Sequence, residues 1–193
     1  MSSPEADPLP SPTTTATTTD RRTVVLDSAL ATFARYGYRK TSMEEVARVA
    51  RISRPGLYFL FSSKEALFRA AVTQTLSRDL TAVEHVLADT GRPLATRLLE
   101  AFDRWAGRYV GPLARDVVVL IEDNPDLLGE IAETAPRRFE ELITDAIAAE
   151  SGRGTATAVA QTVISASIGL KYQAASREFY LERLKVAIEL LVR

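Results

Sequence analysis

The stretch from Ser42 to Phe61 predicts two short helices joined by a tight turn, and it constrains the fold more than any other part of the chain. Ser42 is followed three residues later by Glu45, which is the capping-box pattern at the start of a helix. Ser53 is placed to cap the second helix, and Pro55 falls in its first turn, where a missing N–H group costs nothing. Two helices of this length bury too little apolar surface to be stable alone, so they must pack on a third helix.

The preceding segment supplies this third helix. Asp20 is placed to cap it, and Gly37 is placed to end it. Between them, apolar residues recur at helical spacing and define a buried stripe: Leu26, Ala29, Leu30 and Phe33. We therefore expect a three-helix unit over residues 20–66, preceded by a disordered tail over residues 1–19, which are rich in Ser, Thr and Pro.

Basic residues flank the second short helix. Arg51, Arg54 and Lys64 lie on or beside its expected outer face. Because a helix N-terminus with nearby cations suits a phosphate backbone, the pattern predicts a helix-turn-helix whose second helix contacts DNA. Arg21 and Arg22, at the start of the first helix, either approach phosphates or face solvent from a flexible tail.

The charge of the chain is divided along its length. The formal net charge is −1, but residues 21–70 hold ten Lys and Arg against four Asp and Glu, a net of +6. The remainder holds fourteen against twenty-one, a net of −7. A basic N-terminal unit on an acidic body favours nucleic-acid binding by the helix-turn-helix, whereas the charge division alone also fits an ordinary solvated surface.

An ordered pattern of residues extends from Ala31 to Phe68. Its members are Phe33, Tyr36-Gly37-Tyr38, Thr41-Ser42, Val46-Ala47, Ala50, Ile52-Ser53, Leu57-Tyr58, Phe61 and Ser63-Lys64-Glu65-Ala66-Leu67. This pattern resembles the tetracycline-repressor (TetR-like) family of transcriptional regulators, over the first third of the chain. The sequence departs from the family at Arg51, where Gly is usual, and just before Phe61, where it has Phe59 and Leu60.

The resemblance implies an all-α fold with two domains. We expect an N-terminal three-helix helix-turn-helix DNA-binding domain over residues 20–66 and a C-terminal helical ligand-binding and dimerisation domain over residues 67–193. It also implies a set of DNA contacts, with Arg54 meeting a base edge and Tyr58 and Lys64 meeting phosphates. The contacts that the resemblance implies are Ser42, Ser53, Arg54, Pro55, Gly56, Tyr58 and Lys64, and the candidate set adds Arg51 and Phe59, where the sequence departs from the family.

The rest of the chain also shows helical patterns. A fourth helix should begin at Ser62 or Ser63 and run to about Val86, connecting the DNA-binding unit to the body. No alternating pattern long enough for a sheet is present. The further helices should span about Pro93–Tyr109, Leu113–Ile121, Leu127–Thr134, Pro136–Glu150, Thr155–Ala174 and Arg177–Val192.

Aromatic residues share one face of the helix that follows Pro93. Phe102, Trp105 and Tyr109 recur at helical spacing, and Val118 follows in the next apolar segment. Aromatics in such a pattern are usually core, but they also line apolar ligand pockets. The resemblance favours the pocket, because family members hold a small-molecule inducer in the C-terminal body. The sequence does not identify the ligand.

The last two helices have faces suited to packing against a second copy. Small residues recur on one helix, and an apolar stripe runs along the other. These faces either pack within one subunit or form a dimer interface, and the resemblance favours a homodimer that binds a two-fold symmetric operator. The candidate interface residues are Ala158, Thr162, Ala166, Phe179, Leu184, Ile188 and Leu191.

Composition argues against several other classes of protein. No apolar run approaches the roughly 18 residues of a membrane helix, and no apolar export signal is expected at the N-terminus. The absence of cysteine fits a reducing cytoplasm and excludes Cys-metal sites, while a single His85 makes a metal site or a Ser-His-Asp set unexpected. We expect neither a cofactor nor an enzyme activity.

Together these features predict a cytoplasmic, homodimeric DNA-binding transcriptional regulator, a repressor that a small ligand releases from a palindromic operator. Two alternatives stay open at this stage. One is a helical ligand-binding or protein-interaction module that keeps a helix-turn-helix without using it, and the other is a small all-helical enzyme.

Overall fold

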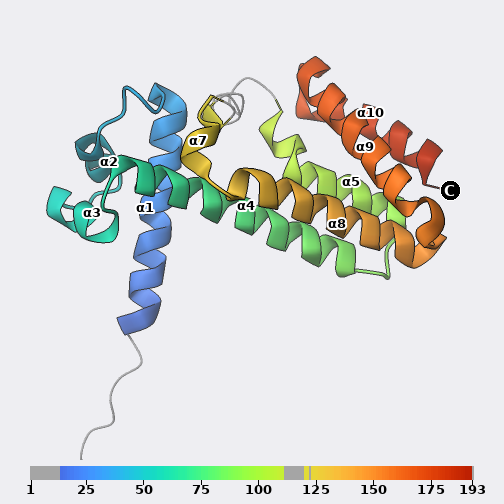
Figure 1. The fold of residues 1–193 in the computed structure, drawn as a ribbon, viewed down its shortest axis with the longest axis horizontal. Coiled ribbons are helices and arrows are strands. Elements are labelled where there is room, and N and C mark those ends of the chain that lie inside the picture. The colour runs from blue at the N-terminus through green and yellow to red at the C-terminus, as the bar shows by residue number, and fades with distance from the viewer. Residues whose placement is uncertain (1–13, 111–119, 122, 193) are drawn as a thin grey trace, which may run out of the picture.

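The computed structural model describes residues 14–110, 120–121 and 123–192, and within these ranges the chain forms helices and loops without strands. The predicted all-α fold is therefore confirmed. The first helices gather at one end of the molecule, and a long helix leads from them into a body built from the later helices (Figure 1). None of the helices in the described ranges is long and apolar enough to cross a membrane.

The N-terminal end is a small bundle with its own apolar core. The core includes Phe33 from the first helix, Val46 from the second and Phe68 from the fourth, each 0% exposed. Gly37 ends the first helix as predicted, because its φ of +81° lies in the left-handed region that glycine adopts without strain. The helices of this end are α1 (Thr14–Tyr36), α2 (Met43–Val49), α3 (Arg54–Leu60) and the first half of α4 (Lys64–Ala88).

The first helix is longer than its sequence signals predicted. It begins at Thr14, so Asp20 lies inside the helix instead of capping it. The predicted disordered tail over residues 1–19 is therefore wrong from Thr14 onward, and residues 1–13 lie outside the described ranges. Ser and Thr have low helix propensity, but a helix can extend through them when its later residues are packed in a core, as those of α1 are.

The body packs around the second half of α4. Its core includes Leu98, Ile143 and Leu184, each 0% exposed. Its elements are α5 (Leu94–Trp105), the 3₁₀ turn η1 (Gly107–Tyr109), α8 (Ile131–Ser151), α9 (Arg153–Gln173) and α10 (Arg177–Leu191), whereas the short α7 (Pro125–Leu128) packs with the N-terminal core.

Three predicted boundaries in the body were wrong. Pro136 lies inside α8 instead of starting it, because Gly129, with a φ of +65°, separates α7 from α8 further upstream. The helix predicted over Leu127–Thr134 is thus divided between α7 and α8. The helix after Pro93 ends at Trp105, so Tyr109 lies on η1.

Candidate DNA-binding surface and ligand cavity

Two serine caps shape the helix-turn-helix as predicted. The Ser42 hydroxyl accepts a hydrogen bond from the Glu45 backbone N–H (3.2 Å) at the start of α2. The Ser53 hydroxyl accepts one from the Gly56 N–H (3.1 Å) at the start of α3. Each cap satisfies an N–H group that lacks a helical partner, so both short helices begin at residues fixed by local sequence.

The turn between α2 and α3 places a non-glycine residue in the left-handed region. Arg51 has a φ of +54°, where a side chain crowds its own backbone. The turn is held by a hydrogen bond from the Ile52 N–H to the Ala47 carbonyl (3.0 Å). The Arg51 side chain is exposed beside the start of α3, so the strained backbone presents a cation on this surface.

One face of α3 is anchored, and the opposite face is open to solvent. Leu57 and the capping residue Phe61 are buried in the N-terminal core. Tyr58 is 42% exposed, and Phe59 is 90% exposed. Arg54 is also exposed, and its guanidinium carbon lies 5.7 Å from the centre of the Tyr58 ring. The outer face of α3 therefore presents an arginine and two aromatic rings to solvent, and Phe59 is the most exposed of the three.

Lys64 points into the N-terminal bundle. Its Nζ donates hydrogen bonds to the carbonyls of Tyr38 (3.0 Å) and Thr41 (3.1 Å), and it lies 4.5 Å from the centre of the Tyr38 ring. In this conformation the ammonium group holds the α1–α2 loop. A phosphate contact by Lys64 stays a prediction, and it requires these hydrogen bonds to be exchanged or shared.

Arg22 lies across the end of α3. Its guanidinium carbon is 4.4 Å from the centre of the Phe61 ring, and Nη1 is 3.5 Å from the Leu60 carbonyl oxygen. Arg22 and its neighbour Arg21 are exposed on an ordered helix, and with Phe59 they line a shallow groove beside α3. Both arginines thus lie next to the candidate DNA surface.

An apolar cavity of about 420 Å³ lies between the two cores of the molecule. Its lining includes Leu30 of α1 and Leu128 of α7, which pack with the N-terminal core. The opposite side is formed by Phe102 and Phe139, which belong to the core of the body. A molecule bound here would contact both parts of the chain at once.

The predicted pocket aromatics meet at this cavity. Phe102, Trp105 and Tyr109 all line it, although Tyr109 comes from η1. Phe139 of α8 joins them, stacked on Trp105 with ring centres 4.9 Å apart and edge-on to Phe102 at 5.2 Å. Val118, the fourth predicted member, lies outside the described residues.

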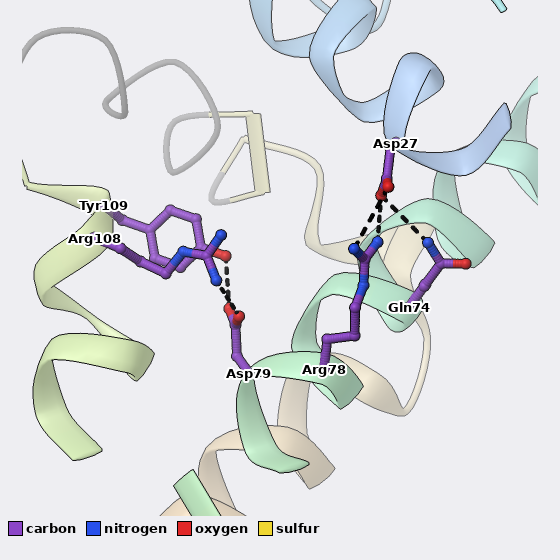
Figure 2. Close-up of polar contacts among 6 residues, drawn as sticks. All are labelled: Asp27, Gln74, Arg78, Asp79, Arg108 and Tyr109. Carbon is purple, nitrogen blue, oxygen red and sulfur yellow. Dashed lines mark hydrogen bonds and ion pairs between the residues drawn. The ribbon is translucent and has the colours of Figure 1, made fainter. Parts of the chain in front are cut away.

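Next to the cavity, charged side chains tie α4 to α1 and to η1 (Figure 2). Arg78 of α4 pairs with Asp27 of α1, which also accepts a hydrogen bond from Gln74 (3.3 Å). Asp79, the next residue of α4, accepts hydrogen bonds from Arg108 Nη1 (2.7 Å) and from the Tyr109 hydroxyl (2.6 Å).

Burial shifts the pKa values of Asp79 and Tyr109. Asp79 is 2% exposed, and burial raises the pKa of its carboxyl, although the hydrogen bond from Tyr109 and the charge of Arg108 act in the opposite direction. Burial and the neighbouring Asp79 raise the pKa of the Tyr109 hydroxyl, which therefore remains a hydrogen-bond donor at neutral pH.

The sequence analysis missed Asp79, although a signal was present. Val72, Asp79 and Val83 recur at spacings of seven and four along α4, so the carboxylate interrupts an apolar stripe on the buried face. A charged residue on a buried helical face needs a partner, and the partners come from a distant part of the chain. Their identity was not available from the local pattern.

The predicted dimer residues separate into two groups in the structure. Ala158, Thr162, Phe179 and Leu191 are exposed and Ala166 is half-buried. The predicted interface role of Leu184 and Ile188 is wrong, because both residues pack in the core of the body of a single protomer. They are 0% and 1% exposed. Helix α10 is apolar on two faces, and its outer face carries Val186 (54% exposed) and Leu190 (60% exposed), which the sequence analysis did not select.

Comparison with known proteins identifies the family. The family described as bacterial regulatory proteins, tetR family, matches residues 25–71. The helix-turn-helix transcriptional regulator RutR of Escherichia coli K12 is 38% identical over 56 residues, which cover 29% of this chain and 26% of RutR. Residues 25–71 of the chain form a helix-turn-helix unit of the tetR family. The match spans only about a quarter of the length of RutR.

Other relatives match over more of the chain. HdnoR of Paenarthrobacter nicotinovorans, a nicotine-responsive transcriptional repressor, is 26% identical over 157 residues, covering 78% of this chain and 79% of HdnoR. A TetR-family structure from Mesorhizobium loti has a TM-score of 0.75 at 21% identity, covering 90% and 95% of the two chains. Reduced Escherichia coli NemR has a TM-score of 0.72 at 19% identity, covering 90% and 98%. These two structures establish that the fold continues through the body.

Proposed function

We propose that this tetR-family regulator acts in the cytoplasm as a homodimeric repressor that binds a palindromic operator through α3 and is released by a small molecule. The observation that carries the proposal is the open face of α3, where Arg54, Tyr58 and Phe59 are exposed on a segment with a net charge of +6. An anchored helix with such a face fits the major groove of DNA.

The residues of this face have separate roles in the proposal. Arg54 hydrogen-bonds a base edge, because a guanidinium matches the two acceptors of guanine. Tyr58 donates to a phosphate, and Phe59 contacts apolar groups in the groove. Arg51 and the cap Ser53 contact phosphates beside the start of α3, and further candidates follow from the same surface: Ser42, Pro55, Gly56 and Lys64.

The cavity between the cores supports control by a small molecule. Its volume of about 420 Å³ lies within the range of ordinary ligand pockets, and its lining is mostly apolar and aromatic. HdnoR is named as nicotine-responsive, and its similarity to this chain favours control of this chain by a small molecule. Because the lining includes Leu30 of α1, an occupant changes contacts that position the DNA-binding end.

The outer faces of α9 and α10 support dimerisation. Val186, Leu190 and Phe179 expose apolar surface on α10, and Ala166 of α9 lines a groove together with Val186 and Leu190. Exposed apolar patches of this kind mark interfaces, and small residues allow helices to approach closely. A dimer places two α3 helices for successive major grooves, which lie about 34 Å apart on one face of the duplex.

Selection of duplexes from a random library by the full chain tests the proposal. The selected duplex and a random duplex are then titrated by fluorescence anisotropy at several salt concentrations. We expect selection of a two-fold symmetric sequence, and an affinity that falls steeply with salt because phosphate contacts release counterions. Arg104→Ala, which removes an exposed arginine from α5, is the matched control and leaves binding unchanged.

A second function is favoured by two observations. Arg54 is paired with Glu44, and Lys64 is hydrogen-bonded to the α1–α2 loop, so two of the proposed DNA contacts are engaged within the protomer. A ligand-binding or protein-interaction module that does not use its helix-turn-helix would keep both arrangements. The same titration discriminates, since salt-independent or absent DNA binding supports the module.

A further inference from the structure

The apolar cavity adjoins a second, charged recess of about 360 Å³. The two share Leu30, Thr75 and Tyr109 as common wall residues. The recess is lined by the charged side chains shown in Figure 2, namely Asp27, Arg78, Asp79 and Arg108. The junction between the two cores therefore combines an apolar chamber with a charged one.

The carboxylates of the recess already have donors on both oxygens. Asp79 Oδ1 accepts from Arg108 and Oδ2 from Tyr109, and the side chain is 2% exposed. Asp27 Oδ1 accepts from Gln74 and Arg78, and Oδ2 accepts from the second terminal nitrogen of Arg78 at 3.4 Å. Neither carboxylate is poised to receive a cation from a ligand.

The guanidinium groups have donors to spare. A guanidinium has five N–H groups. Arg78 directs two terminal nitrogens to Asp27, and Arg108 directs one to Asp79. Their side chains are 52% and 51% exposed, and among the described residues their Nε–H groups have no hydrogen-bond partner. The recess is thus rich in donors and saturated in acceptors.

The apolar chamber, like the recess, suits a ligand with a negative charge better than one with a positive charge. Its lining includes Lys171, and no Asp or Glu among the described residues lines it. A carboxylate buried against arginine is stabilised by charge-assisted, two-point hydrogen bonds, whereas a buried ammonium without an available carboxylate is strongly disfavoured.

We propose that this junction binds an amphipathic organic acid, with its apolar body in the chamber lined by Phe102, Trp105 and Phe139 and its carboxylate on Arg108 and Arg78. The proposal rests on the cavity being the ligand site of the proposed function, and it names the chemical class of that ligand. It also connects the ligand to α1, because Arg78 binds Asp27 and a carboxylate head competes for the same guanidinium.

Three probes of equal chain length test the proposal directly: decanoic acid, decanamide and decylamine. Isothermal titration calorimetry on the full chain without DNA, at neutral pH, gives the three dissociation constants. We expect decanoic acid to bind about tenfold or more tightly than decanamide, and decylamine to bind most weakly. Tighter binding of decylamine, equal binding of acid and amide, or no binding by any probe overturns the proposal.

Matched variants assign the head group to the arginines. Arg78→Gln and the double variant Asp79→Asn/Arg108→Gln keep hydrogen-bonding side chains in place, so neither leaves an unpaired buried charge. Each should bring the acid-to-amide ratio toward one, mainly by weakening the binding of decanoic acid. Arg104→Gln, on the exposed face of α5, should keep the wild-type ratio. An unchanged ratio in both recess variants contradicts the assignment.

The outcome is separable from that of the proposed function. These titrations contain no DNA, so a preference for the acid supports the inference even if no duplex is selected from the library. Conversely, salt-sensitive DNA binding together with indifferent probes supports the repressor and overturns the organic-acid ligand.

Discussion

Arg54 of α3 reaches back to Glu44 of α2, with 2.6 Å between Nη2 and the carboxylate oxygen Oε1. The two side chains are 60% and 49% exposed, so water screens the pair and its contribution to stability is at most about 1 kcal/mol. Replacing this pair by the proposed contact between Arg54 and DNA therefore costs little free energy. In the free protein the pair holds the Arg54 guanidinium at the start of α3, beside α2.

The first prediction concerns Arg54. Arg54→Ala should weaken binding to the selected duplex by about 1–3 kcal/mol and relax the base preference, because a two-point contact to a base edge is lost. Binding to random duplex should fall much less. Glu44→Gln should strengthen binding to both duplexes, since it removes a competing anion. Anisotropy titrations decide, and an equal loss on both duplexes would show that Arg54 contacts phosphate alone.

The second prediction concerns the strained turn. Arg51→Gly should relieve the left-handed strain at φ +54° and raise the free energy of unfolding by roughly 0.5–1 kcal/mol. The gain is smaller than the full left-handed penalty because glycine also increases the conformational entropy of the unfolded chain. The same change removes a cation, so the salt dependence of DNA binding should become shallower by about one phosphate contact. Urea unfolding and salt titrations measure the two effects.

Arg51→Asn separates the effect of backbone strain on stability from the effect of the lost positive charge on DNA binding. Arg51→Asn keeps a side chain that tolerates the left-handed region, so it should recover part of the stability while losing the same charge. If Arg51→Gly lowers stability, the turn is held by contacts of the arginine side chain instead of being strained by it.

The third prediction concerns Lys64. Lys64→Met should lower the free energy of unfolding by about 1–3 kcal/mol, because it leaves the Tyr38 and Thr41 carbonyls without their donor. DNA binding should weaken on all sequences alike, whether through a lost phosphate contact or through a displaced α1–α2 loop. Thermal unfolding distinguishes these routes: a variant that keeps wild-type stability but binds DNA less tightly assigns Lys64 to phosphate.

Local signals allowed the helix-turn-helix to be predicted closely. Ser42, Ser53 and Gly37 act through hydrogen bonds or backbone angles within a few residues, so their effects follow from the sequence alone. The inward positions Leu57 and Phe61 follow from the same short-range geometry. Each of these residues determines the start, the end or the inner face of one helix.

Relationships between distant segments did not follow from the sequence. Asp79 and Tyr109 are 30 positions apart in the sequence, and Asp27 and Arg78 are 51 positions apart. Helical periodicity relates only residues a few positions apart, so it does not indicate either pair. Helix α10 posed a different problem, because its inner residue Leu184 and its outer residue Val186 are both apolar. Periodicity identifies two apolar faces but does not tell which one packs within the protomer.

The fourth prediction separates these two faces of α10. Val186→Glu and Leu190→Glu should convert the proposed dimer to a monomer, because each buries a charge at the interface. Val24→Glu, at an exposed apolar position on α1, should leave the dimer intact. Leu184→Ala should instead lower the free energy of unfolding by about 2–5 kcal/mol, as expected for a core residue. Sedimentation velocity and urea unfolding measure the two effects, and a wild-type monomer would contradict the dimer.

The last prediction follows from the burial of Asp79. Burial raises the pKa of its carboxyl in the folded protein above the unfolded value of about 3.9. Between the two pKa values the folded state binds more protons than the unfolded state, so stability falls as the pH rises through this window. The contribution is fully present below the unfolded pKa and lost above the folded one.

Asp79→Asn cannot titrate, and it therefore isolates this contribution. The free energy of unfolding of the wild type minus that of Asp79→Asn should decrease as the pH rises from about 4, and then level off above the folded pKa. Urea unfolding at a series of pH values measures the difference, with Asp145→Asn as a control at an exposed carboxylate of α8. A difference that grows with pH would mean that the ion pair with Arg108 and the hydrogen bond from Tyr109 outweigh burial, and that Asp79 is held as a stabilised anion between η1 and α4.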